Sequence, residues 1–141
     1  MIGIIVFCHG TMAQGMKHAA EMIVGPQPDF TAIGIEPGQG RQQVSDLLDA
    51  AIADNNTNNG ILVMTDLVGG TPCNTTALKM GKDIEMLAGF SLPSLIKALL
   101  SRSEVSDPRE LADLVSEYGR QHMTTGTEML RAHGRAEPDH G

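Results

Sequence analysis

The sequence has 141 residues, about the length of one domain. Of these residues, 41% are hydrophobic and 19% are charged, which is enough apolar material for one core. This composition excludes a disordered chain. A net charge of −7 and only 3% aromatic residues argue against a nucleic-acid-binding protein, which normally carries a basic surface and aromatic stacking platforms. No apolar run approaches the about 18 residues of a membrane span, so any membrane association is expected to be indirect.

The first half of the chain alternates between strand and helix patterns. Residues 2–8 form a continuous apolar run rich in β-branched side chains, typical of a strand buried on both faces of a parallel sheet. Residues 12–23 carry apolar side chains at helical spacing, and Gly25-Pro26 ends this helix. Residues 31–35 are a weaker strand signal, and residues 44–52 carry a complete amphipathic helical stripe.

The alternation continues in the middle of the chain. Residues 61–65 repeat the strand pattern of the first segment, and residues 84–88 repeat it more weakly. Between them, Thr71 is interpreted as the N-cap of a helix with Pro72 at its first position, and we expect this helix to reach Met80.

The C-terminal part contains two further helix patterns and one ambiguous segment. Ser91 is expected to cap a helix over residues 92–100, and Asp107 begins another with a capping-box pattern. Residues 123–130 fit either a helix or a strand, and residues 134–141 read as a polar tail. With no internal repeat or linker, we expect one domain over residues 1–133.

This order of elements predicts an α/β fold: an open, doubly wound, mostly parallel sheet of about four strands with helices on both faces. In such sheets, ligands bind beyond the carboxyl ends of the strands, where the strand order reverses. The residues to inspect are therefore those that follow Cys8, Ile35, Thr65 and Gly89.

The residues after the first and third predicted strands combine into a candidate phosphoryl site. His9 follows the first strand and Asp66 the third, so the two side chains face each other if these strands are neighbours. A glycine pair then leads into a helix N-terminus, whose backbone N–H groups favour anions. His9 and Asp66 are the candidate catalytic residues, and the candidate phosphate-binding residues are Gly10, Thr11, Gly69, Gly70 and Thr71.

Each of these features also has an ordinary structural interpretation. A histidine after a strand is often only a solvated polar residue, and an aspartate there is often a turn former. Only their coincidence at the expected sheet edge favours function. The other histidines have no acidic partner at a useful spacing, and His18 is expected to be solvated.

Other chemistries find little support in the motifs. No HxH or HExxH pair occurs, so we expect no metal site, and no GxxxxGK[ST] or GxGxxG motif indicates nucleotide binding. Cys8 and Cys73 form no CxxC pair, and we interpret both as small buried residues, with a reactive thiol as the alternative. Residues 1–8 are too short and lack the basic start of a signal peptide, so we expect a cytoplasmic protein.

Taken together, these residues resemble the IIA component of the mannose family of the bacterial phosphoenolpyruvate–sugar phosphotransferase system. The resemblance covers His9-Gly10, the Glu36-Pro37-Gly38 loop and the stretch from Asp66 to Asn74, and it continues through Ala88-Gly89 to Leu92-Pro93. The chain departs from the family pattern in two places: Val68 stands where an aromatic residue is common, and Cys73 where a phenylalanine is common.

The resemblance implies a function. His9 would accept a phosphoryl group from phospho-HPr and pass it to IIB, expected here as a separate protein, and Asp66 would orient the His9 ring. No cofactor is implied. The family also forms homodimers in which a C-terminal antiparallel strand is exchanged between subunits, and residues 123–130 are the candidate strand.

Three alternatives stay open at this point. The chain could be the IIA-like phosphocarrier of a dihydroxyacetone kinase system, because the residues around His9 do not separate the two relays. It could be a regulatory module whose phosphorylation state controls a partner without sugar transport. It could also be a small-molecule-binding domain of flavodoxin-like shape in which His9 is structural.

Overall fold

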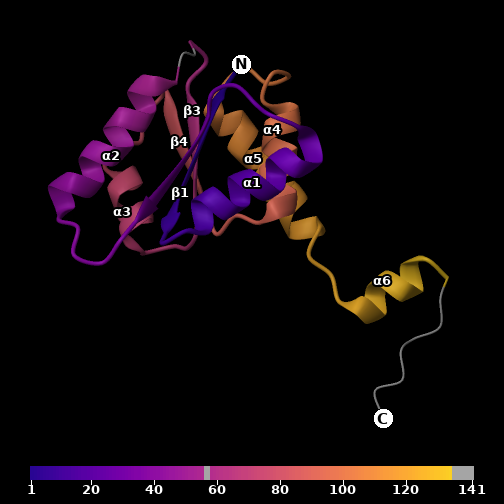
Figure 1. The fold of residues 1–141 in the computed structure, drawn as a ribbon. Helices are drawn as coiled ribbons and strands as arrows, with labels where there is room; N and C mark the ends of the chain where they lie inside the picture. Colours follow the sequence, from indigo (N-terminus) through magenta and orange to yellow (C-terminus); the bar gives the residue numbers. More distant parts are fainter. Residues whose placement is uncertain (56–57, 135–141) are drawn as a thin grey trace.

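The computed structural model describes residues 1–55 and 58–134, and in these residues a parallel sheet lies between two layers of helices (Figure 1). The strand order is β2-β1-β3-β4, and every neighbouring pair is parallel. The predicted α/β fold with a four-stranded parallel sheet is therefore confirmed. The strands are β1 (Gly3–His9), β2 (Phe30–Ile35), β3 (Ile61–Thr65) and β4 (Ile84–Ala88).

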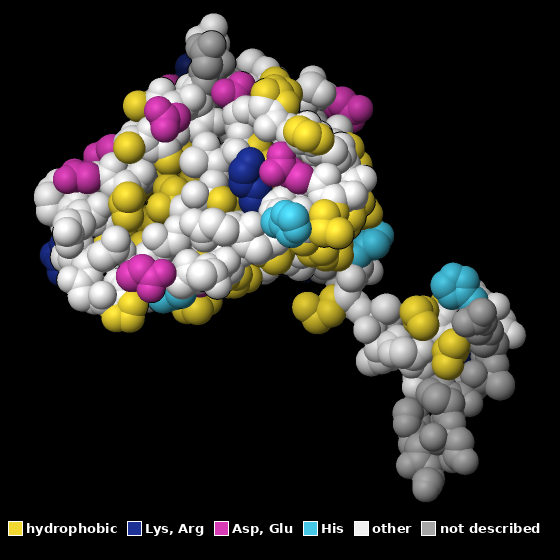
Figure 2. Space-filling view, viewed as in Figure 1, with side chains coloured by type: hydrophobic (Ala, Val, Ile, Leu, Met, Phe, Trp, Pro, Cys, Tyr) yellow, Lys and Arg dark blue, Asp and Glu magenta, His cyan; other side chains and the backbone are white. Residues whose placement is uncertain are grey.

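Helices cover both faces of this sheet. Helices α2 (Arg41–Asp54) and α3 (Thr71–Ala77) pack on one face, and α1 (Met12–Val24), α4 (Leu92–Ser101) and α5 (Pro108–Gln121) pack on the other (Figure 1). A sixth helix, α6 (Gly126–Ala132), stands apart from this body, as Figures 1 and 2 show. Among the described residues, no helix is both long and apolar enough to span a bilayer.

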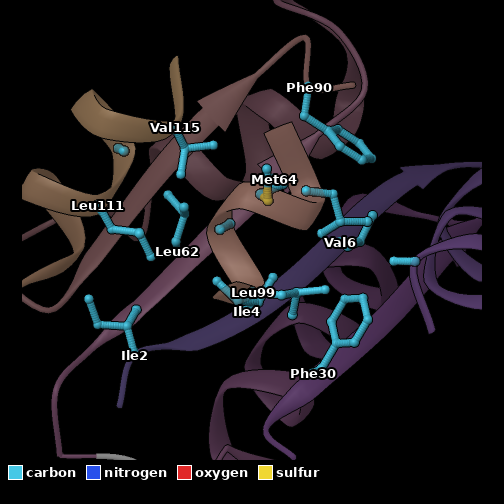
Figure 3. Packing of buried hydrophobic residues seen from close by; sticks show 14 of the residues in the cluster. Ile2, Ile4, Val6, Phe30, Leu62, Met64, Phe90, Leu99, Leu111 and Val115 are labelled. Carbon is cyan, nitrogen blue, oxygen red and sulfur yellow. The ribbon is translucent and has the colours of Figure 1, made fainter. Parts of the chain in front are cut away.

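The core consists of two clusters, one on each face of the sheet. Alternate residues of β1 enter different clusters: Ile4 and Val6 face α1, α4 and α5, whereas Ile5 and Phe7 face α2. Figure 3 shows Ile4 and Val6 within the first cluster. Because all four side chains are fully buried, the strand needs no polar face, which explains its unbroken apolar sequence.

Arg102, at the end of α4, is a buried cation that the sequence pattern does not reveal. Its side chain is only 1% exposed, and its guanidinium donates hydrogen bonds to the carbonyl oxygens of Pro28 (2.6 Å) and Asp29 (3.0 Å) and to Oε1 of Gln27 (3.2 Å). The Arg102 carbonyl in turn accepts a hydrogen bond from the N–H of Ile2. Arg102 therefore ties the α1–β2 connection and the start of β1 to α4.

The start of α3 differs from the prediction. Gly70, not Thr71, is the N-cap residue, and Thr71 is the first helical residue with no capping hydrogen bond from its side chain. Gly70 has the extended backbone that an N-cap requires, which moves the cap one residue earlier. The helix also ends at Ala77 rather than Met80, and Leu78 begins the turn that leads to β4.

The strand alternative for residues 123–130 is wrong for the single chain, which forms α6 over Gly126–Ala132 instead. Thr125 caps this helix by accepting a hydrogen bond from the N–H of Glu128, and Glu128 pairs with Arg131 one turn later. These local contacts need no second strand, whereas a β-strand needs a partner edge. Strand exchange between subunits stays a prediction, and all but the first residue of the expected polar tail lies outside the described residues.

Candidate functional site

The structure brings the predicted pair His9 and Asp66 into contact. His9 ends β1 and Asp66 follows β3, and because these strands are parallel neighbours both residues lie at the same sheet edge. One carboxylate oxygen of Asp66 lies 2.7 Å from His9 Nδ1 and accepts a hydrogen bond from the His9 backbone N–H at 2.9 Å. The Asp66 side chain is 7% exposed and the His9 side chain 49%. Asp66 thus holds the ring at Nδ1, and the exposed half of the His9 side chain is accessible to a partner.

The protonation of this pair follows from its hydrogen bonds. Burial raises the pKa of the Asp66 carboxyl, but the hydrogen bonds from the backbone N–H and ring of His9 more than offset it, and the pKa lies below its ordinary value. Asp66 is therefore ionised at neutral pH. An ionised carboxylate only accepts hydrogen bonds, so His9 Nδ1 carries a proton and Nε2 holds the free lone pair.

The loop between β3 and α3 forms the wall beside the His9 ring. A side chain at Gly70 would place its Cβ 3.0 Å from His9 Cε1, so the ring would have to shift by a few tenths of an ångström to admit it. Gly69 has a φ of +84°, a left-handed conformation that favours glycine. The carbonyl of Gly69 accepts a hydrogen bond from the Asn74 side chain at 3.1 Å, a support that sequence analysis did not predict.

On the other side of His9, Gly10 and Thr11 connect β1 to α1. Gly10 has a φ of +58°, and its N–H donates to the carbonyl of Ile35 at 2.8 Å, which anchors the turn on β2. Thr11 is exposed, and its side chain makes no capping hydrogen bond. Gly10, Thr11, Gly69 and Gly70 therefore lie in the two loops next to His9, and Thr71 begins the helix after the second loop. The role of these five residues in phosphate binding stays a prediction.

Gly34 supports the site and was missed in the sequence. It pairs with Cys8 across the sheet, and a Cβ at this position would lie only 2.1 Å from the Gly10 carbonyl oxygen. The absence of a side chain thus allows the turn after His9 to lie against β2. A glycine within a strand pattern is itself a signal of close backbone approach, and this signal was available in the sequence.

We expect Gly34→Ala to destabilise the fold by roughly 1–3 kcal/mol, the usual cost of overpacking, and to displace the turn that positions His9. Urea unfolding measures the first effect, and the His9 ring signals in NMR spectra measure the second. The matched control is Gly15→Ala in α1, where a Cβ meets no atom within 4 Å. That substitution should stabilise the protein by about 0.5–1 kcal/mol. Equal stabilities of the two variants would contradict this role of Gly34.

The lowered pKa of Asp66 predicts a pH-dependent contribution to stability. A carboxyl whose folded-state pKa is depressed stabilises the fold above its unfolded pKa of about 4 and loses that contribution as the pH falls through the folded value. Asp66→Asn should therefore destabilise the protein at pH 7, and its difference from the wild type should shrink towards pH 3. Denaturant unfolding at both pH values measures this, with Asp113→Asn in the exposed ion pair of α5 as the control. A pH-independent difference would contradict the prediction.

The remaining candidates do not join the site. Cys8 and Cys73 are both buried free thiols, and burial together with the charge of Asp66 raises the pKa of Cys8 to about 12. Cys8 is therefore a thiol at neutral pH, which favours its interpretation as a small apolar residue. His18 is exposed on α1, as expected. Nδ1 of His122 contacts the Tyr118 carbonyl at 2.8 Å at the end of α5, and His140 lies outside the described residues.

The chain is similar to proteins of one transport system. A family model described as the PTS system fructose IIA component, where PTS is the phosphotransferase system, matches residues 3–115. The PTS system mannose-specific EIIAB component of Escherichia coli (strain K12) is 30% identical over 133 residues, which cover 93% of this chain and 40% of that protein. The chain thus spans less than half the length of this relative.

Two further similar proteins are matched over most of their own length. The PTS system sorbose-specific EIIA component of Lacticaseibacillus casei is 34% identical over 105 residues, 73% of this chain and 75% of that protein. The crystal structure of phosphotransferase system component EIIA from Streptococcus agalactiae superposes with a TM-score of 0.80 at 31% identity, covering 89% of this chain and 97% of that chain. The match from β1 into α5, together with these likenesses, shows that the chain belongs to the EIIA-man family, the mannose-family IIA components of the phosphotransferase system.

Proposed function

We propose that the protein is a phosphocarrier of a sugar phosphotransferase system that accepts a phosphoryl group from phospho-HPr on His9 and transfers it to a separate IIB protein. Membership of the EIIA-man family supports the phosphocarrier role. The observation that carries the assignment to His9 is its contact with the buried carboxylate of Asp66 at the edge where β1 and β3 end. The sugar-specific relatives favour a sugar relay over the dihydroxyacetone kinase alternative.

In the proposed reaction, His9 is the nucleophile and Asp66 its positioning residue. The lone pair on Nε2 attacks the phosphorus of the HPr phosphohistidine, so a P–N bond forms on His9 as the donor P–N bond breaks. Asp66 retains the proton on Nδ1 and stabilises the positive charge that develops on the ring. Little other covalent chemistry is required, because positioning and charge stabilisation determine the rate of phosphoryl transfer.

The two loops beside His9 would hold the transferred group. The backbone N–H groups of Gly69 and Gly70 and the hydroxyls of Thr11 and Thr71 donate no hydrogen bond within the described residues. Because Thr71 does not cap α3, its hydroxyl is available to a phosphoryl oxygen, which supports the binding role over a purely structural one. A charge-assisted hydrogen bond of this kind contributes roughly 1.5–3 kcal/mol.

The direct test uses purified chain, enzyme I, HPr and phosphoenolpyruvate, followed by intact mass spectrometry. We expect the mass to increase by one phosphoryl group, and we expect no increase when HPr is omitted. An unchanged mass with the complete donor system would contradict the proposal. We also propose that the carrier acts in the cytoplasm and pairs with a second copy, as the family resemblance implies.

A further inference from the structure

A cavity of about 440 Å³ lies between the first turn of α2 and the outer side of α3. This volume falls within the range of small-molecule binding sites. Its lining contains one cation and no carboxylate, although the whole chain carries a net charge of −7. The polar residues of the lining are Gln39, Arg41, Thr71, Asn74 and Thr75.

Arg41 is the cation, and its side chain is exposed on the first turn of α2. Its guanidinium makes no hydrogen bond or ion pair with any described residue, whereas Lys17 and Lys79 pair with carboxylates. Arg41 is also the first residue of α2, and that turn contains no acidic residue. A cation at a helix N-terminus opposes the helix dipole, so the stability of α2 does not account for it.

Two threonines of α3 line the same cavity. Thr71 and Thr75 are four residues apart on α3, which places them one above the other on one side of the helix. Neither hydroxyl donates a hydrogen bond within the described residues, although Thr75 is only 9% exposed. The neighbouring Thr76 differs, because its hydroxyl donates to the Pro72 carbonyl at 2.8 Å. A guanidinium and two hydroxyls without partners are donors suited to an oxyanion.

We propose that this cavity binds a small metabolite through one anionic group, a phosphate monoester or a carboxylate. Arg41 would pair with the anion, and Thr71 and Thr75 would donate hydrogen bonds to its oxygens. The apolar side chains of Val44 and Leu78 line the same cavity and would contact the uncharged body of the ligand.

The ligand site adjoins the His9 loop through two residues. Asn74 lines the cavity and also holds the Gly69 carbonyl, and Thr71 follows Gly70, which lies against the His9 ring. A bound anion would therefore compete with the phosphoryl group on His9 for the single proton of the Thr71 hydroxyl, and the two negative charges would repel each other. Ligand binding would weaken phosphorylation, and phosphorylation would weaken ligand binding by the same factor. This regulatory consequence rests on the proposed function, whereas binding to the unphosphorylated chain does not.

The binding test is an NMR titration of the unphosphorylated chain with glycerol 3-phosphate, with butyrate and with inorganic phosphate as separate probes. We expect saturable shifts at Arg41, Thr71 and Thr75 with glycerol 3-phosphate or butyrate, and the tighter of the two identifies the anionic group. Arg41→Gln should weaken this binding at least about tenfold, the loss expected for one charge-assisted hydrogen bond. Thr75→Val, nearly the same shape without the hydroxyl, should weaken it as well.

Arg109→Gln, which removes an exposed arginine already paired with Asp113, is the matched control and should bind like the wild type. Absence of saturable shifts with all three probes would overturn the proposal, and so would unchanged affinity in Arg41→Gln. In the phosphorylation assay without probe, Arg41→Gln should behave as the wild type. A saturating probe should slow phosphorylation of the wild type but not of Arg41→Gln. If the probe binds but the wild type is never phosphorylated, the site stands and the proposed function fails.

Discussion

His9→Ala should abolish phosphoryl acceptance while leaving the fold intact. The ring is half exposed at the end of β1, outside both core clusters, so its removal should change the free energy of unfolding by about 1 kcal/mol or less. No other described histidine contacts a carboxylate at the sheet edge. Intact mass after incubation with enzyme I, HPr and phosphoenolpyruvate measures acceptance, and urea unfolding measures stability.

The matched control for this experiment is His122→Ala. The His122 ring stacks on Tyr118 at the end of α5 and contacts no carboxylate among the residues that the structure describes. We expect this variant to be phosphorylated like the wild type. Phosphorylation of His9→Ala at the wild-type level would overturn the assignment and direct attention to His18 or His122.

Arg102→Leu should lower the free energy of unfolding by about 2 kcal/mol or more. The substitution removes the donor to the Pro28 carbonyl and to Oε1 of Gln27, and each group left unsatisfied costs about 1–3 kcal/mol. The Asp29 carbonyl loses one of its two donors and keeps the N–H of Ile4. The effect should be confined to stability, because Arg102 holds the start of β1 while His9 is at its end. Under conditions in which Arg102→Leu is folded, it should therefore still accept a phosphoryl group.

Arg109→Leu is the control for Arg102→Leu, because Arg109 is an arginine whose side chain is 75% exposed. Its removal should change stability by no more than about 0.5 kcal/mol, as is usual for surface sites. Guanidinium chloride unfolding of both variants gives the comparison. If Arg102→Leu loses as little free energy of unfolding as the control, the hydrogen bonds of the Arg102 guanidinium make no net contribution to stability.

The strands and the candidate site were predictable because local patterns determine them. Residues 61–65 and 84–88 form strands with the predicted bounds, since apolar runs between polar turns leave little freedom in where a buried strand begins and ends. The contact between His9 and Asp66 required one further step, the rule that neighbouring parallel strands end at the same sheet edge.

The features missed by sequence analysis depend on contacts between distant segments or on a shift of one residue. Arg102 contacts residues more than seventy positions earlier in the chain, and no local pattern distinguishes it from an exposed arginine. Gly34 matters because of a carbonyl oxygen in another loop. The N-cap of α3 is Gly70 rather than the predicted Thr71. Both residue types are compatible with an N-cap, and only the backbone conformation decides between them.

The most direct test of the central claim is to identify the phosphorylated nitrogen. The chain is labelled with ¹⁵N-histidine, phosphorylated by HPr and recorded by long-range ¹H–¹⁵N NMR, which distinguishes the two ring nitrogens. Since Asp66 retains the proton on Nδ1 of His9, we predict a single phosphohistidine at His9 with the phosphoryl group on Nε2. Phosphorylation at His9 Nδ1, or at any other histidine, would contradict the mechanism.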